Sequence, residues 1–335
     1  AKSIRDIVAK SSKKSFKINL YSIFEYAFED QGNLSNSGDL QFFHLVTFLK
    51  DIVKDCQSNC KHLLIIDGLD EILSSREIQY QSLAALISEV KKLNIFFKQN
   101  NVPFKILLLC RTDLFERLPH PNKNKIRQDG AVLIDWFNDP HTPSNSNIIK
   151  LANKRCKLKY PEVDSVFETF FLRDLEVKNI RNFLLNHTRH TPRDFLQLLK
   201  HIQAVTISDS VSINEVLKGI NNYSKNYFLP EIKDELVGYI DFSLVDDLFR
   251  MISSLGKRDF QLREIHALAD KRESSLDIEE VFNTLFECSA IGHIYRKEGD
   301  KNYFLFKFRN HNLSFNPSDR IILHRGIWKS LNIVR

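Results

Sequence analysis

Short apolar runs alternate with longer segments of helical periodicity over the first part of the chain. Apolar residues recur at helical spacing over 40–53 and 80–97. Three short apolar runs that end in polar residues have the pattern of buried strands: HLLIID (62–67), KILLLC (105–110) and AVLIDWF (131–137). Buried strands joined by helices long enough to serve as crossovers are typical of a parallel sheet covered on both faces. We therefore predict an α/β fold, with an αβα domain over residues 1–147.

A loop rich in proline and asparagine, NDPHTPSNSN, separates this domain from a mainly helical region. Helical periodicity is found at 148–158, 176–187 and 193–205, and a longer helical stretch begins with INEVLKGINNYSKNYF. These segments predict a small helical domain over residues 148–240.

From residue 241 the pattern predicts three helices and then a β-hairpin. The helices span 244–255, 262–269 and 278–289, and the alternation in AIGHIYRKEGDKNYFLFKF predicts two strands that turn at 298–300. Three helices followed by a two-stranded hairpin make a winged helix. We expect such a domain, with a basic tail, over residues 241–335.

Composition indicates a soluble globular protein in a reducing compartment. Hydrophobic residues make up 43% of the chain and charged residues 27%, and no apolar run reaches the roughly 18 residues needed to cross a bilayer. The five cysteines are odd in number and scattered, which does not suit a disulfide framework. We expect a cytoplasmic protein that does not enter membranes.

An acidic cluster follows the first predicted buried strand, in the string IIDGLDE. Adjacent carboxylates after such a strand suit Mg²⁺ and a water: one orients the hydrated ion, and the other polarises the water that attacks a γ-phosphate. Asp67 would be the first of these, and Asp70 or Glu71 the second. The simpler alternative is that Asp67 caps the next helix while the other two favour its positive N-terminal end.

The phosphate-binding loop that would normally serve such a cluster is not found in these 335 residues. That loop needs two glycines five apart, with Lys and Ser or Thr after the second. Gly256 precedes Lys257, but Met251 stands five residues before it, and Gly32 and Gly38 are six apart without a lysine. The opening helix AKSIRDIVAK and strand FKINL are the elements that should follow such a loop. We therefore expect the loop just before Ala1, and a complete gene that starts here without the motif would defeat this expectation.

With these motifs in order, the chain resembles the STAND branch of AAA-like P-loop ATPases, and within it a bacterial group of defence-associated ATPases. The likeness covers nearly the whole chain. It depends on LLIIDGLDE as the Walker B strand, ILLLCRTDLFERL as the sensor 1 strand, NKIRQDGAVLIDW as the next strand, and TRHTPRDFLQLL as the start of a sensor 2 helix. YSKNYFLPEIKDEL and HRGIWKSLNI complete it.

The resemblance implies a site for ATP and Mg²⁺ at the strand ends. Asp67 would be the carboxylate beside the metal, and Asp70 and Glu71 would be candidates to activate water. Arg111 would take the sensor 1 position near the γ-phosphate, with Thr112 next to it in the nucleotide-binding set.

Arg193 matches the sensor 2 position, where a guanidinium grips phosphate oxygens and reports the presence of nucleotide through the lid. In the simpler alternative, Thr191 caps a helix, Pro192 is its first residue and Arg193 faces solvent. Arg127, in KNKIRQD, would be an arginine finger for a neighbouring subunit or merely a solvated charge.

Positive charge is concentrated at the C-terminus. From Gly292 to Arg335 there are nine Lys or Arg and three Asp or Glu, a difference of nine minus three, or +6, which equals the formal net charge of the chain. Non-specific contact with a nucleic-acid backbone would use the side chains of the predicted wing: Arg296, Lys297, Lys301, Lys307 and Arg309. The helix that would read DNA bases carries Asp277, Glu279, Glu280 and Glu287 instead, which opposes insertion into a groove. Phe304, Phe306 and Phe308 share one strand face and are expected in the core, and Trp328 is expected to anchor a helix.

These patterns, with the resemblance, lead us to expect an ATP-driven conformational switch that controls an effector in bacterial antiphage defence or a stress response, as a homo-oligomer. One alternative is a DNA-handling ATPase of the origin-recognition or loader kind, which has the same order of domains. The other is a scaffold whose nucleotide site has been lost.

Overall fold

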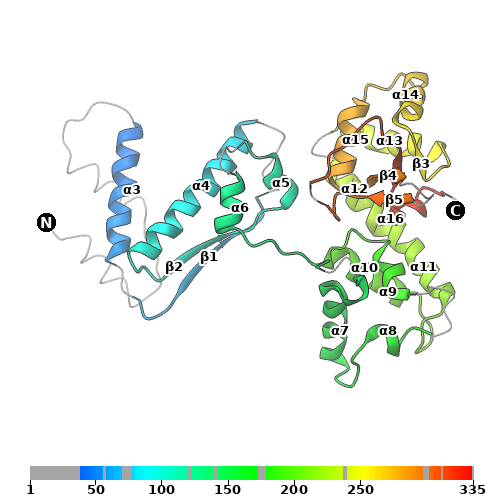
Figure 1. Ribbon diagram of the computed structural model, residues 1–335, viewed down its shortest axis with the longest axis horizontal. Coiled ribbons are helices and arrows are strands. Elements are labelled where there is room, and N and C mark those ends of the chain that lie inside the picture. Colours follow the sequence, from blue (N-terminus) through cyan, green and yellow to red (C-terminus); the bar gives the residue numbers. More distant parts are fainter. Residues whose placement is uncertain are drawn as a thin grey trace. The chain divides into compact units, whose positions relative to one another are not determined.

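The fold is described from a computed structural model of the chain (Figure 1). The described residues are 38–55, 58–69, 77–119, 123–138, 142–172, 179–236, 240–296, 302–310 and 312–333. Two compact units make up the chain: one combines 1–67 with 87–109, and the other combines 68–86 with 110–335.

The first unit contains a parallel pair of strands. β1 (His62–Ile66) pairs with β2 (Phe104–Leu108) in the register His62↔Phe104 to Ile66↔Leu108. α3 (Gly38–Lys54) precedes β1, and α4 (Glu77–Gln99) lies between the strands in the sequence, its later turns belonging to this unit. Parallel strands need a crossover of this length. The two strands, the helix between them and the parallel pairing that the sequence predicted are confirmed.

A side chain of α4 forms hydrogen bonds with the outer edge of β2. Asn94 Nδ2 donates to the carbonyl oxygen of Ile106 at 2.8 Å, and Asn94 Oδ1 accepts from the backbone N–H of Ile106 at 2.8 Å. An asparagine side chain offers one donor and one acceptor in the arrangement of a peptide group, so it takes the place of a neighbouring strand at this residue. The contact also fixes α4 against the sheet.

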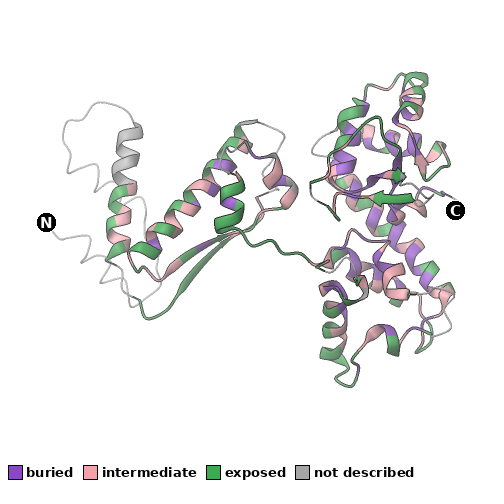
Figure 2. Ribbon diagram, in the orientation of Figure 1, coloured by how far each residue is buried: buried purple, intermediate pink, exposed green. Residues whose placement is uncertain are grey.

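The expectation of a sheet covered on both faces is not met by the described strands. Leu63, Leu64 and Ile65 are 57%, 46% and 53% exposed, and Figure 2 shows β1 largely as exposed. Their alternating directions mean that both faces of β1 remain open.

The third predicted strand, at 131–137, is wrong as a strand. These residues form no helix or strand, and Val132, Leu133 and Ile134 are 89%, 64% and 68% exposed. A strand exists only through hydrogen bonds to a neighbouring strand, and this segment pairs with none of the described strands. The predicted strand at FKINL lies outside the described residues.

The second unit begins with short helices and continues into a helical region that ends near residue 236. Its elements are α5 (Thr112–Arg117), α6 (Lys123–Gly130), the 3₁₀ turn η1 (Pro143–Asn145), α7 (Asn147–Lys159), α8 (Val166–Thr169), α9 (Ile180–Leu185), α10 (Pro192–Gln203), α11 (Ile213–Tyr223), the π-helical turn η2 (Ser224–Phe228) and α12 (Leu229–Leu236). The helices predicted at 148–158 and 193–205 are confirmed as α7 and α10. Of the helix predicted at 176–187, α9 is the described part.

The C-terminal part of this unit combines helices with an antiparallel sheet. Its elements are α13 (Phe242–Ser254), β3 (Asp259–Phe260), α14 (Leu262–Lys271), α15 (Ile278–Glu287), β4 (Ile291–Arg296), β5 (Asn302–Leu305), β6 (Ile321–Leu323) and α16 (Arg325–Trp328). The sheet order is β3-β6-β4-β5. The three helices and the hairpin β4–β5 follow the prediction, whereas β3 and β6 were not predicted. The turn expected at 298–300 lies outside the described residues.

One apolar core runs through both parts of the second unit. It extends from Ile148 on α7 to Ile333 near the end of the chain, and it includes Phe195 on α10 and Phe282 on α15, each 0% exposed. The helical region and the C-terminal sheet therefore stabilise each other through buried apolar surface.

Within the described part of the chain, we find no helix that is long and apolar enough to span a bilayer.

Candidate functional site

The carboxyl ends of β1 and β2 lie at one edge of the parallel pair. Asp67 directly follows β1 and is exposed, and Gly68 after it has a φ of 77°, the left-handed backbone that glycine adopts without strain. The N–H of Leu109 donates to the carbonyl oxygen of Ile66 at 2.9 Å, which extends the pairing by one residue. Asp67 therefore lies where the sequence placed it. The other two predicted acidic residues, Asp70 and Glu71, lie outside the described residues.

Arg111 and Thr112 begin α5, a few residues after β2. Arg111 is the N-cap residue, with extended backbone and no hydrogen bond from its side chain to the helix end, and it is exposed. Thr112 is the first helical residue. Their positions agree with a strand that runs into a helix, and their sensor 1 and nucleotide-binding roles stay predictions.

Arg193 occupies the position that the simpler alternative gave it. Thr191 Oγ1 accepts from the backbone N–H of Asp194 at 3.1 Å, and Pro192 is the first residue of α10. The Arg193 side chain is 73% exposed and forms an ion pair with Glu231 at 2.9 Å. Arg127 on α6 pairs with Glu116 and lies over the Phe115 ring at 5.5 Å.

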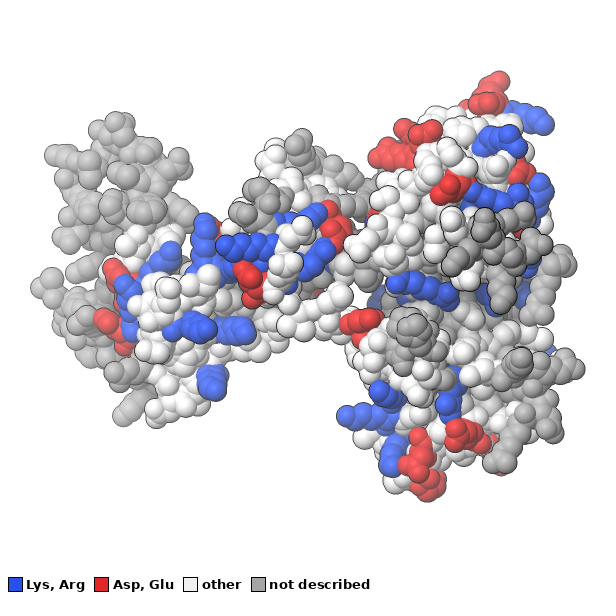
Figure 3. All heavy atoms as spheres, in the orientation of Figure 1, with Lys and Arg blue, Asp and Glu red and all other residues white. Residues whose placement is uncertain are grey.

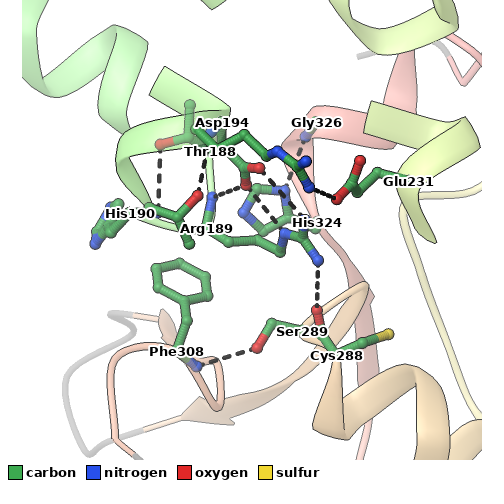
Figure 4. A network of polar contacts seen from close by, with 12 residues as sticks. Thr188, Arg189, His190, Asp194, Glu231, Cys288, Ser289, Phe308, His324 and Gly326 are labelled. Atoms are coloured by element: carbon green, nitrogen blue, oxygen red, sulfur yellow. Dashed lines mark hydrogen bonds and ion pairs between the residues drawn. The ribbon is translucent and has the colours of Figure 1, made fainter. Parts of the chain in front are cut away.

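Arg189, four residues before Arg193, is the buried arginine of this segment, and the sequence did not single it out. Its Nε donates to Asp194 Oδ2 at 3.0 Å (Figure 4). Its Nη1 donates to Glu235 Oε1 at 2.6 Å. The side chain is 10% exposed, and that of Asp194 is 1% exposed. Burial alone would lower the pKa of the Arg189 guanidinium, but the charges of Asp194 and Glu235 outweigh it and hold that pKa well above its usual value.

Further contacts of Asp194 and of Arg189 extend this network. Tyr227 Oη, from the π-helical turn, donates to Asp194 Oδ1 at 3.0 Å, and burial followed by the Asp194 charge raises the pKa of Tyr227. The Arg189 guanidinium lies over the Phe228 ring at 5.4 Å, and its Nη1 is 3.5 Å from the carbonyl oxygen of Cys288 at the end of α15. The network therefore links α10, α12 and the π-helical turn to the C-terminal sheet region.

Two buried histidines lie beside this network. The His190 ring packs between Phe137 and Phe308, with centroid distances of 3.9 and 4.6 Å, and neither ring nitrogen has a hydrogen-bond partner among the described residues. His324 stacks on Phe228 at 4.9 Å, and its Nδ1 accepts from the backbone N–H of Gly326 at 3.0 Å. Burial, with Arg309 nearby, places the pKa of His190 well below its usual value, and burial also lowers that of His324. Both imidazoles are therefore neutral near pH 7.

The sequence signal for Arg189 is weak. TRHTPRDF contains two arginines, and the resemblance to a sensor 2 helix selected the second. An Arg and an Asp five residues apart show no helical pairing. The partner Glu235 is 46 residues away in the sequence, a distance that no local pattern reports.

Of the five basic residues predicted for the wing, Lys307 and Arg309 have described side chains. Lys307 forms an ion pair with Glu287 at 3.2 Å, donates to the carbonyl oxygen of Leu313 at 2.6 Å and is 14% exposed. Arg309 Nη2 donates to Asn186 Oδ1 at 2.9 Å. The side chain of Arg296, together with Lys297 and Lys301, lies outside the described residues. Of the phenylalanines, Phe306 is buried as expected, while Phe304 is 39% exposed, and Trp328 packs against the core as an anchor.

The helix that would read DNA is held inside the protein. Six of the ten residues of α15 are buried: Ile278, Val281, Phe282, Thr284, Leu285 and Phe286. Glu279 and Glu280 lie among the exposed positions, and Figure 3 shows acidic side chains over α14 and α15 beside basic ones. A helix must expose a face to enter a groove, and the exposed face here is acidic.

A complete site for ATP and Mg²⁺ is not formed by the residues described. Asp67 is a suitable oxygen ligand for Mg²⁺, but the described residues contain no group of three or more His, Cys, Asp or Glu side chains that could hold a metal ion. The glycine loop for the phosphates does not occur in the sequence. We therefore assign no hydrolytic step to these residues.

Comparison with known protein families, with curated proteins and with solved structures finds no match for this chain.

Proposed function

We propose that this chain belongs to an ATP-dependent molecular switch of the STAND-like kind, in which the carboxyl edge of β1 and β2 faces the nucleotide. The observation that supports it most is the parallel pair itself. Ligands of α/β proteins bind beyond the carboxyl ends of parallel strands. Here Asp67 follows one strand directly, and the segment from Leu109 to Thr112 follows the other.

In this proposal, Asp67 orients a hydrated Mg²⁺. Asp70 or Glu71 as the residue that activates water, Arg111 and Thr112 in the nucleotide-binding set and Arg193 as sensor 2 keep the roles that the resemblance gives them. The phosphates also need a glycine loop that the 335 residues do not contain. The proposal is therefore tested on the product of the full reading frame that encodes the chain.

The C-terminal elements fit the output side of such a switch. We interpret α13, α14, α15 and the hairpin β4–β5 as a winged helix, with β3 and β6 completing its sheet. The common core and the Arg189 network join this region to α10 and α12. The effector, the assembly as a homo-oligomer and the role in antiphage defence come from the resemblance alone.

The DNA-handling alternative is less well supported. The buried α15 and its exposed glutamates oppose base reading, and Lys307 is held in an ion pair. The scaffold alternative needs no phosphate loop, and nucleotide binding separates it from the switch.

Nucleotide binding tests the proposal. A fluorescent ATP analogue with Mg²⁺ is titrated into this chain and into the product of the full reading frame that encodes it. We expect binding by the latter alone, weakened by Asp67→Asn. Asp51→Asn, which removes an exposed carboxylate on α3, is the matched control. The scaffold interpretation follows if neither protein binds.

A further inference from the structure

A cavity of about 370 Å³ lies between the helical region and the C-terminal end of the second unit. One wall comes from α9 and α11, with Leu217 and Ile220 on α11. The other comes from α16 and the residues after it, including Trp328 and Ile333. Sites for small organic molecules have this range of volumes and are mostly apolar, with a few polar groups that orient the ligand.

The polar groups at this cavity are mainly cations. Arg258, Arg325 and Lys329 line it, and none of its lining residues is acidic. The guanidinium groups of Arg258 and Arg325 lie 5.8 and 5.6 Å from the centre of the Trp328 ring, so the aromatic side chain holds both beside the opening.

One acidic neighbour among the described residues is shared with a further cation. Asp259 lies 3.8 Å from Arg258, but its other oxygen accepts a shorter contact of 2.6 Å from Arg320. Burial, followed by the charge of Arg325, lowers the pKa of Arg309, a further cation near Arg325. A positive potential above low-dielectric walls attracts anions.

We propose that this cavity binds a small amphipathic anion, whose carboxylate or phosphate meets Arg258, Arg325 and Lys329 while its apolar body packs between Ile220, Ile333 and Trp328. Both walls must hold their positions to bind such a molecule. Occupancy would therefore stabilise the contact between the helical region and α16. The proposal is independent of the nucleotide switch.

The fluorescence of Trp328 provides a direct readout, since the chain has two tryptophans. Trp136→Phe leaves Trp328 as the donor for energy transfer to the anionic dye 1-anilinonaphthalene-8-sulfonate. We expect saturable transfer with this dye. The neutral N-phenyl-1-naphthylamine, with the same apolar body, should bind at least about tenfold more weakly, equivalent to about 1.4 kcal/mol.

Variants of the cavity locate the site. Arg325→Gln and Lys329→Gln should each weaken dye binding by about tenfold, whereas Arg263→Gln, which removes the same charge from an exposed position on α14, should leave it unchanged. Leu217→Phe should narrow the cavity from its exposed side and weaken binding, without changing the charge or adding a second tryptophan donor. If Arg325→Gln lowers the melting temperature, the Lys329→Gln variant decides whether the cavity cations are needed for dye binding, because Lys329 is exposed.

Competition then identifies the source of the anion. Displacement of the dye by dodecanoate would indicate an aliphatic carboxylate, and displacement by adenosine monophosphate would indicate a phosphate ester. Displacement by neither would mean adventitious dye binding. Such adventitious binding would overturn the proposal. So would equal binding of the neutral dye, or unchanged dye binding in both Arg325→Gln and Lys329→Gln.

Discussion

Arg189 and Arg193 are four residues apart, and their surroundings give them opposite roles. Arg193 is 73% exposed and pairs with one carboxylate, so solvent screens the pair. Arg189 lies between Asp194 and Glu235 at 10% exposure, so its loss would leave buried carboxylates without a counter-charge. Whether an arginine points into the core is decided by tertiary contacts, which no local sequence pattern reports, and the resemblance selected the exposed arginine.

Arg189→Met should lower the free energy of unfolding by about 3 to 5 kcal/mol, because methionine fills the space but cannot neutralise Asp194. Arg193→Met should cost about 1 kcal/mol or less. Urea denaturation of both variants measures the difference. Equal losses would show that the Arg189 network contributes no more than a surface ion pair.

The buried histidines predict that stability decreases in mild acid. The folded-state pKa values of His190 and His324 lie well below the unfolded value of about 6.5. The unfolded chain therefore binds more protons below that pH, so their contribution to stability is complete above about pH 6.5 and is lost as the pH falls below it.

His190→Asn should reduce this pH dependence between pH 7 and 5. Asparagine tolerates the φ of 57° at this position and does not titrate. His266→Asn, at a half-buried position on α14, is the comparison. Melting temperatures across the pH range give the slopes, and a slope unchanged by His190→Asn would contradict the assignment.

At the scale of elements, long periodic segments were predictable and short or neighbour-dependent ones were not. α4, α7, α10 and α15 follow from helical spacing. β3 and β6 are two and three residues long, which is too short to show alternation. They are strands because β6 pairs with both β3 and β4. The segment 131–137 has a strand's composition but pairs with none of the described strands. The strand-end position of Asp67 was predictable, because it depends only on where an apolar run stops.

The packing of α10 against α11 depends on Gly219. A Cβ added there would lie 2.5 Å from the Ile202 side chain and 2.6 Å from its Cα. Gly219→Ala should therefore destabilise the protein by about 1 to 3 kcal/mol, as overpacking does.

Gly130→Ala is the matched control, since nothing lies within 4 Å of a Cβ added at that position of α6. It should change stability by less than about 1 kcal/mol. Thermal denaturation compares the two alanine variants, and equal melting temperatures would show that the helices can separate without cost.

At the scale of the whole molecule, the described residues from α7 onward share one core although the sequence suggests two domains. Apolar residues from α7 to the last described residue belong to one cluster, and the Arg189 network crosses the same boundary. The two parts should therefore unfold together.

Leu198→Ala on α10 and Phe282→Ala on α15 each remove a side chain that is 0% exposed, so each should cost about 2 to 5 kcal/mol. Either change should lower the hydrogen-exchange protection of α10 and β4 alike. Val132→Ala, at an 89% exposed position, should change neither. Loss of protection confined to the mutated part would indicate two independent domains.

Hydrogen exchange of the product of the full reading frame, with and without ATP and Mg²⁺, tests most directly whether the carboxyl edge of β1 and β2 faces a nucleotide. Nucleotide should slow exchange at 66–69 and 109–114, where backbone N–H groups follow the strands, and Asp67→Asn should reduce this effect. Exchange in α15 serves as the internal reference. Unchanged exchange at both strand ends under saturating nucleotide would contradict the proposed site.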